Sequence, residues 1–137
     1  YLHMYWIHTP VEYAREWQYG YKQVVSEVKK IEKDYNKIVV TYHYDQPYIY
    51  FLFYNQIDPS WYQQNWGGGE IKRAERKFGK YEFRRIYWPS ERGGASTIFV
   101  GNESDLPAQD MNPENLIKIK EVFYPDKTHA LRVVALQ

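Results

Sequence analysis

Apolar side chains recur at three- and four-residue steps early in the chain, and lysines occupy much of the opposite face. The apolar positions are Trp17, Tyr21, Val24, Val25, Val28, Ile31 and Tyr35. This spacing predicts one long amphipathic helix. Thr9 and Pro10 supply its cap and first residue, with Glu12 placed as in a capping box. Gly20 within the helix costs about 1 kcal/mol relative to alanine, so it marks either a close contact or a break.

The pattern then changes to that of a strand. Residues 37–44 are rich in β-branched and aromatic side chains, which predicts a buried central strand parallel to a neighbour. Asp45-Gln46-Pro47 ends this strand, and residues 48–54 form a second helix that is apolar nearly all round. We expect such a helix to be heavily covered.

The remaining segments predict short elements. Asp58 and Pro59 repeat the cap-then-proline signal and start another short helical turn. Three glycines at 67–69 are expected to form a flexible loop, and residues 105–113 a loop or a short helix. Strands are predicted at residues 80–88, with Tyr81, Phe83, Arg85 and Tyr87 on one face, at 97–100, and at 117–124 and 130–136, the last two as an antiparallel hairpin.

The order of these elements predicts the fold class. Helix, strand, helix, two strands and a hairpin indicate a small layered α/β domain with a mixed sheet. A length of 137 residues allows one domain with a substantial core. We therefore divide the chain into an aromatic lead-in at residues 1–10 and a single α/β domain at 11–137.

The lead-in has two interpretations. It either packs against the domain or leads in from a membrane, where Tyr and Trp gather at the interface. The chain begins with Tyr1 rather than methionine and shows no signal peptide, so we expect an excised piece or a processed product. No apolar run reaches the roughly 20 residues that cross a bilayer.

Composition narrows the classes of partner. The 18 basic and 17 acidic side chains leave a net charge of +1, so nucleic acid is not expected as a partner. Aromatic residues make up 19% of the chain, including 15 Tyr and 5 Trp. Such side chains suit half-buried surfaces, interfaces and sugar-facing platforms. The absence of cysteine excludes disulfides, thiolate metal sites and a cysteine nucleophile.

No motif carries a catalytic signature. The glycine pairs and triplets lack the strand–helix context of a phosphate-binding loop, and no serine follows the first strand as a nucleophile would. The four histidines lack the paired spacing of metal ligands. We therefore expect no cofactor, no metal and no catalytic residue in this chain. Asn102-Glu103-Ser104 fits the pattern of a glycosylation acceptor.

The best candidate for ligand binding is the junction after the first strand. Tyr44, Asp45 and Gln46 lie there at the predicted carboxyl edge of the sheet, where α/β proteins keep their ligand sites. Capping of the following helix is an alternative role for Asp45. Asp45 and Asp58 both lie at predicted helix starts. It stays open that they form the carboxylate pair of a glycosidase.

Two tryptophans complete the candidate site. Trp61 and Trp66 follow Asp58 closely, and they either stack on sugar rings or pack in the core. For Asp58 a capping role is favoured over chemistry.

Several stretches together resemble a known family. They are residues 16–22, Asp45-Gln46-Pro47-Tyr48-Ile49, residues 51–54, Asp58-Pro59, Tyr62-Gln63 and Phe123-Tyr124-Pro125-Asp126. The series resembles the soluble carboxyl-terminal domain of polytopic membrane glycosyltransferases similar to dolichyl-phosphate-mannose–protein mannosyltransferases. The resemblance covers most of the chain from about Glu12 onward, and its motifs are aromatic and structural rather than catalytic.

The resemblance implies a non-catalytic accessory domain on the extracytoplasmic face of the cell membrane. The partner would be a transmembrane part of the same polypeptide, which takes sugar from a polyprenyl-phosphate donor and carries the catalytic acids. A glycan or polypeptide acceptor would be a further partner. Two alternatives stay open: a free-standing carbohydrate- or small-ligand-binding module, and a small glycan hydrolase built on Asp45.

Overall fold

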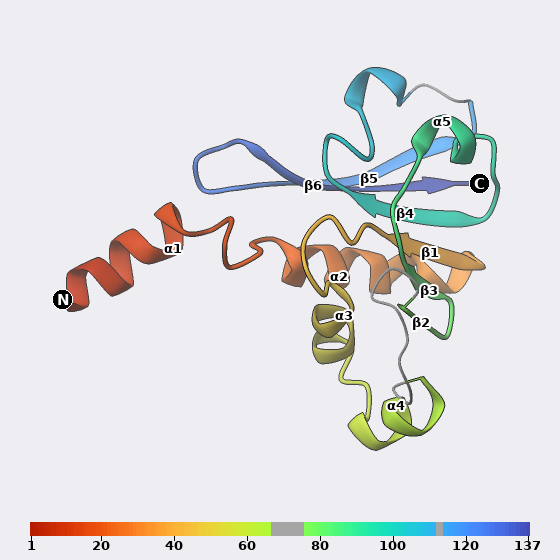
Figure 1. The fold of residues 1–137 in the computed structure, drawn as a ribbon. Helices are drawn as coiled ribbons and strands as arrows, with labels where there is room; N and C mark the ends of the chain where they lie inside the picture. The colour runs from red at the N-terminus through yellow and green to blue at the C-terminus, as the bar shows by residue number, and fades with distance from the viewer. Residues whose placement is uncertain (67–75, 112–113) are drawn as a thin grey trace.

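A computed structural model of the chain describes residues 1–66, 76–111 and 114–137. Its strands form one six-stranded sheet in the order β2-β3-β1-β4-β6-β5 (Figure 1). The strands are β1 (Lys37–Val40), β2 (Arg76–Phe78), β3 (Tyr81–Phe83), β4 (Thr97–Gly101), β5 (Leu116–Phe123) and β6 (His129–Leu136). The glycines at 67–69, predicted to form a loop, fall outside the described residues.

The sheet is mixed, as predicted. β1 lies between β3 and β4 and runs parallel to both, which confirms a central parallel strand. β2 with β3, β4 with β6 and β5 with β6 are antiparallel. The β5–β6 pair is the predicted hairpin. Because β1, β3 and β4 are parallel, their carboxyl ends meet at one edge, and the β1–α3 junction lies there.

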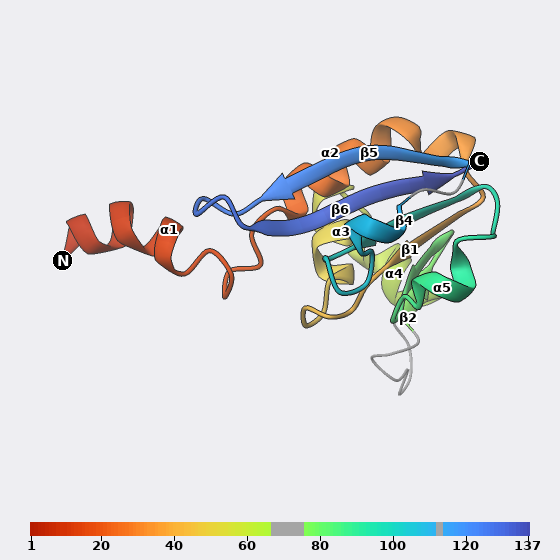
Figure 2. The same cartoon turned by 90° about the horizontal axis from the view of Figure 1, so that it is seen from above.

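Helices cover both faces of the sheet, as Figure 2 shows for α2 and α5. α2 (Tyr21–Ile31) and α3 (Tyr48–Tyr54) pack on one face, over a core that includes Val24, Val28, Phe51 and Phe83. α5 (Trp88–Glu91) covers the other face, where Trp88 packs with Phe99 and other buried side chains. A 3-10 turn, Ala108–Asp110, lies within the segment for which a loop or a short helix was predicted.

The prediction of one long helix from Thr9 to Tyr35 is wrong. The chain forms a π-helical turn (Met4–His8), α1 (Thr9–Glu12), α2 and a 3-10 turn (Glu32–Asp34), with a break before α2. Gly20 sits in the break at φ 102°, and a Cβ there would lie 2.8 Å from Val122 Cγ1. Gly20, in the left-handed region, is the N-cap residue of α2, so the break ends there, and its lack of a Cβ permits the close approach to Val122.

The predicted start of that helix is also wrong. The helical turns begin before Thr9, and the Thr9 hydroxyl donates to the Met4 carbonyl oxygen at 3.2 Å instead of capping. Trp17, expected on the buried face, is 70% exposed.

Residues 1–17 form an arm that projects beyond the sheet, at the far end of the molecule from the C-terminus (Figure 1). We call this segment the N-terminal arm. Arg15 anchors its base to the β5–β6 turn, with Nη2 3.1 Å from Asp126 Oδ2 and 2.8 Å from Thr128 Oγ1. The guanidinium also lies 4.9 Å from the centre of the Tyr124 ring. No helix within the described residues is both long and apolar enough to cross a membrane.

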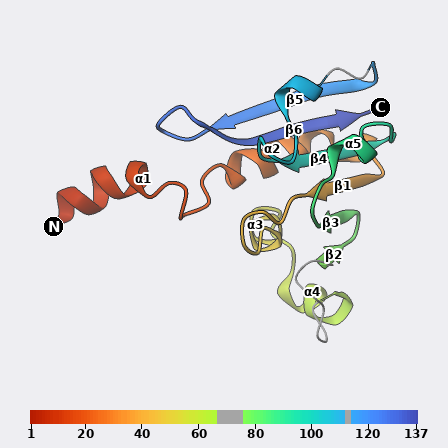
Figure 3. The ribbon, with the colours of Figure 1, turned by 45° about the horizontal axis from the view of Figure 1, so that its top comes forward.

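The expectation that α3 would be heavily covered is wrong. Phe51 is buried, but Phe53 is 72% and Ile49 47% exposed. The helix has only one side on the core, and its other side is apolar as well. α4 (Pro59–Asn65) follows it and protrudes with it from one side of the sheet (Figure 3).

The strand predicted at 80–88 is shorter than expected. Pairing ends at Phe83, and α5 begins at Trp88. Arg85 and Tyr87 are exposed, whereas Ile86 and Trp88 are buried, so the single alternating face is wrong after β3. β2, which pairs with β3, was not predicted.

Candidate functional site

The β1–α3 junction is built by a short network of hydrogen bonds. Thr41 is buried at the end of β1, and its hydroxyl accepts the backbone N–H of His43 at 3.1 Å. Gln18, at the base of the arm, donates from Nε2 to the backbone carbonyl of Asp45 at 3.0 Å. These contacts fix the chain where it leaves the sheet.

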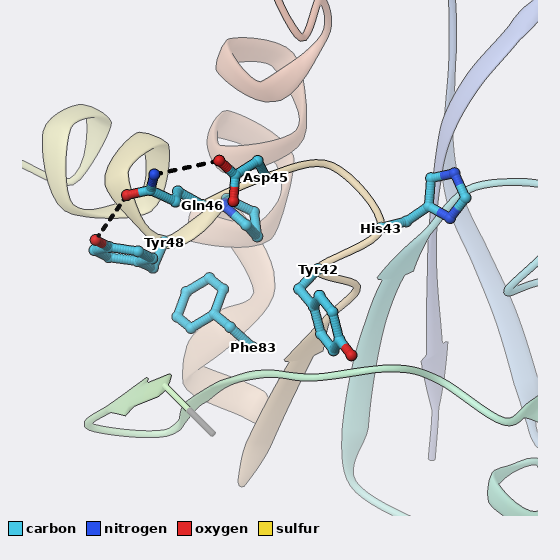
Figure 4. A pocket seen from close by; sticks show the side chains of 7 residues that line it. Tyr42, His43, Asp45, Gln46, Tyr48 and Phe83 are labelled. Carbon is cyan, nitrogen blue, oxygen red and sulfur yellow. Dashed lines mark hydrogen bonds between the residues drawn. The ribbon is translucent and has the colours of Figure 1, made fainter. Parts of the chain in front are cut away.

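Side chains of the junction line a pocket of about 300 Å³ at the carboxyl edge of β1 and β3 (Figure 4). Gln46 donates from Nε2 to Asp45 Oδ2 at 3.3 Å, and Tyr48 donates from its hydroxyl to Gln46 Oε1 at 3.2 Å. The lining residues are Tyr42, His43, Asp45, Gln46, Pro47, Tyr48 and Phe83. Carboxylate, amide and aromatic groups in one pocket suit a small neutral ligand with hydroxyl groups.

Gln46 has a backbone conformation that residues other than glycine rarely adopt. Its φ is 54°, in the left-handed region. Such a conformation costs of order 1–3 kcal/mol and persists only where surrounding contacts hold it. Here the Gln18 contact to the preceding carbonyl and the bonds of the Gln46 amide supply that restraint.

Asp45 does not hold the capping position predicted as its alternative role. The N-cap position of α3 belongs to Pro47, which offers no capping side chain. Asp45 therefore lies two residues before the cap, in the lining of the pocket.

Tyr44, the third predicted residue of the junction, belongs to the core rather than to the pocket. Its ring packs against the buried cluster under α2, and its hydroxyl accepts a hydrogen bond from Tyr124 at 3.1 Å. Burial is the main cause that raises the pKa of Tyr124 above its ordinary value, with the Tyr44 bond adding to it. Neighbouring Tyr21 is fully buried, and burial likewise raises its pKa. The Tyr124 and Tyr21 phenols therefore stay neutral and have a structural role.

The second predicted cluster lies apart from this pocket. Asp58 caps α4, accepting the Trp61 backbone N–H at Oδ1 over 2.8 Å, which confirms its capping role. Trp61 is 43% exposed, whereas Trp66 packs partly buried against the core. Asp58 lines a different groove, between α3 and α4, so Asp45 and Asp58 do not share a pocket.

Two arginines outside the pocket, Arg84 and Arg132, form ion pairs. Arg84 binds Glu91 through two 2.7 Å contacts, and Arg132 is buried between Glu103 and Glu121 at 2.7 and 2.9 Å. No group of three or more His, Asp or Glu side chains suited to a metal ion occurs among residues 1–66, 76–111 and 114–137.

The glycosylation pattern at Asn102 has a structural role. Asn102 is buried, and its Oδ1 accepts the backbone N–H groups of Ser104 and Asp105, each at 3.0 Å. Its side chain thus shapes the turn after β4.

Sequence reasoning missed most of the pocket lining. Tyr42, His43, Tyr48 and Phe83 were not assigned to the site, although Tyr42, His43 and Tyr48 flank the junction in sequence. Phe83 comes from β3, and only the parallel pairing of β1 with β3 brings it there. The position of Asp45 and Gln46 beside the end of β1 was the available signal.

Comparison of the chain with protein-family models, with curated proteins and with solved structures found no match. The functional argument therefore rests on the structure itself and on the resemblance in the sequence.

Proposed function

We propose that this chain is a non-catalytic accessory domain of a membrane glycosyltransferase that uses a polyprenyl-phosphate-linked sugar. The domain would lie at the extracytoplasmic face of the cell membrane, joined to a transmembrane part of the same polypeptide. The observation that carries the proposal is the N-terminal arm.

The arm is helical yet uncovered. Residues 1–11 contain no Lys, Arg, Asp or Glu. Tyr5, Trp6 and Ile7 are all more than half exposed, and no residue of the π-helical turn or α1 is buried. A helical segment rich in Tyr and Trp, whose one acidic side chain is Glu12 at its end, suits the boundary between headgroups and acyl chains. A surface facing only water would carry charged side chains on at least one side.

The junction pocket supports the proposal that this domain acts beside a catalytic centre and is not that centre itself. Gln18 joins the base of the arm to the Asp45 carbonyl, so the pocket lies at the end of the domain from which the arm leaves. A glycan or polypeptide acceptor bound there would be held close to the membrane surface. The pocket offers hydrogen-bonding groups for such an acceptor.

The test compares the isolated chain with the natural polypeptide in membranes. We expect the purified chain to transfer no sugar from a polyprenyl-phosphate donor. We expect membranes with the intact polypeptide to transfer it, and removal of residues 11–137 to lower that transfer while the membrane part stays inserted. Transfer that is unaffected by the removal would contradict the proposal, as would glycan turnover by the purified chain.

A free-standing carbohydrate- or small-ligand-binding module is the second candidate, favoured by the junction pocket itself. Neutral monosaccharides and their oligomers would then shift the amide resonances of residues 42–48 in the purified chain. Asp45→Ala would abolish the shifts with the fold intact, and Asp58→Ser, in the separate groove, would retain them. No shift with any sugar would leave the accessory-domain proposal as the better account.

A further inference from the structure

A second apolar surface, left uncovered by the residues that the structure describes, lies on α3 and α4. Ile49 and Phe53 are four residues apart on α3, so their side chains lie on the same side, one turn from each other. That side faces away from the core, which holds Phe51. We call the exposed side of the two helices, with the groove between them, the α3–α4 surface.

The groove has a volume of about 580 Å³ and an apolar floor. Leu52, Phe53 and Ile57 contribute from α3 and the turn after it, and Pro59 and Tyr62 from α4. Its polar lining consists of the Gln56 and Gln63 amides and the Asp58 carboxylate. The surface is therefore mainly apolar, with one charged group in its lining.

Charge is almost absent from this part of the chain. Asp58 is the only Asp, Glu, Lys or Arg in residues 46–66, although 26% of the whole chain is charged. The Asp58 carboxylate accepts the Trp61 backbone N–H, so it serves α4 itself. A surface that fixes the register of a protein partner usually does so with complementary charges. Here the groove lining provides a single charged side chain, Asp58, which is already engaged as the cap of α4.

The α3–α4 surface instead suits the lipid–water boundary of a bilayer whose lipids carry no net charge. Trp and Tyr place their apolar rings among acyl chains and their polar tips among headgroups, and amides hydrogen-bond in the same zone. Trp61, on the same helix α4, is half-exposed, and Tyr62 lines the groove. The N-terminal arm has the same composition: aromatic, helical and free of charge over residues 1–11.

We infer that the α3–α4 surface is a second contact with the bilayer, which seats the domain on zwitterionic lipid in addition to the arm. The inference rests on the proposed function, since that function places the domain at a membrane. It adds an orientation: with the arm and the α3–α4 surface both on the lipid, the domain is held at two points.

The test measures binding of the 137-residue chain to vesicles of phosphatidylcholine by flotation. Ile49→Ser with Phe53→Ser is expected to weaken partitioning by about tenfold or more, because two apolar side chains no longer leave water. The matched control is Ile117→Ser with Phe123→Ser, the same residue types at 37% and 48% exposure on β5, and it should leave partitioning unchanged. Added salt should have little effect, because no charge pair is involved.

The arm is tested in parallel with Tyr5→Ser and Trp6→Ser. If only the arm variant loses binding, the inference about the α3–α4 surface is overturned and the proposed function stands. If the unmodified chain does not bind vesicles at all, both membrane contacts are overturned. A concentration-dependent dimer that the Ile49/Phe53 variant abolishes would identify a second copy as the occupant and overturn the inference.

A second measurement covers the case in which the double variant fails to fold. Lipids brominated in their acyl chains quench tryptophans that enter the boundary. We expect Trp61→Phe to remove part of the quenching of the bound chain. Equal quenching with and without Trp61 would count against the inference.

Discussion

The Gln18 side chain donates a hydrogen bond from Nε2 to the backbone carbonyl of Asp45 over 3.0 Å. This contact joins the base of the N-terminal arm to the loop that leaves the central strand. It ties the candidate pocket to the segment proposed to meet the membrane, although the two residues belong to different elements.

Removal of this contact should loosen the junction without unfolding the protein. Gln18→Gly keeps the left-handed backbone, at φ 50°, and deletes only the side chain. We expect backbone amides of residues 43–46 to exchange with solvent about fivefold faster, the effect of one lost hydrogen bond of about 1 kcal/mol. Amides of β1 and β4 should be unaffected. Unchanged exchange at the junction would show that the bond does not restrain it.

Gly20 is the position of the break before α2 where a side chain is least tolerated. Gly20→Ala forces a Cβ within 2.8 Å of Val122 Cγ1 at a φ of 102°. We expect a loss of about 2 kcal/mol in the free energy of unfolding, measured by urea denaturation. Gly93→Ala is the control, since a Cβ there meets nothing within 4 Å. Equal effects of the two variants would contradict the packing argument.

Asp58 should contribute to stability as a cap and not to ligand binding at the junction. Asp58→Ala leaves the Trp61 N–H without its acceptor and should cost about 1 kcal/mol of unfolding free energy. Asp58→Ser retains a capping oxygen and should recover most of that loss. A serine variant as unstable as the alanine variant would argue for a role other than capping.

Arg132 is a buried charged residue of β6, and we expect the stability of the domain to depend on it. Its guanidinium contacts Glu103, Glu121 and the Leu106 carbonyl oxygen. Arg132→Ala leaves Glu121 without one partner and opens a cavity. We expect the free energy of unfolding to fall by about 3 kcal/mol, and not by more, because Glu103 is half-exposed and its ion pair is weakened by water.

Arg132→Met fills most of the volume and separates packing from charge. A smaller loss for the methionine variant than for the alanine variant is expected, because methionine replaces the buried apolar stem of the arginine. Thermal unfolding of both variants makes the comparison. Identical losses would assign the whole effect to the ion pairs.

Stability should fall on mild acidification because of His129. Burial is the largest cause that lowers the pKa of His129 below 6.5, and the Arg132 charge adds to it, while Glu103 and Glu121 act in the opposite sense. The unfolded chain thus binds this proton more readily than the folded one. The free energy of unfolding therefore decreases as pH falls below about 6.5 and levels off below the folded pKa.

Urea midpoints between pH about 7.5 and 5.5 test this slope, since few carboxylates titrate there. The Asp126 pKa, lowered to about 2 mainly by the Thr128 hydroxyl bond, affects only stronger acid. His129→Gln should flatten the dependence in this window. A variant that keeps the original slope would assign it to other groups.

The central part of the fold could be predicted because its signals are local. The β-branched run at Ile38–Val39–Val40, the apolar run at Ile98–Phe99–Val100 and the turn before His129 each determine their own element. Asp58 was read correctly as a cap for the same reason, since the capping oxygen and its N–H lie three residues apart.

The missed features depend on residues far apart in sequence. The break before α2 ends at Gly20, where a side chain would meet Val122 on β5, and the chain after β3 places Trp88 in the buried cluster on the opposite face of the sheet. The apolar run at 48–54 indicates a helix correctly, but periodicity does not reveal that Phe53 stays 72% exposed. Phe83 joins the junction pocket only through strand pairing.

Arg15 gives the arm a fixed direction. Its guanidinium is held by the Asp126 carboxylate, the Thr128 hydroxyl and the face of the Tyr124 ring, all on or beside one tight turn. The length of that turn therefore helps to set the tilt of the arm relative to the sheet. Inserting or deleting one residue in it would re-aim the arm while leaving the six strands paired, so variation in this turn would change how the domain stands on whatever surface the arm meets.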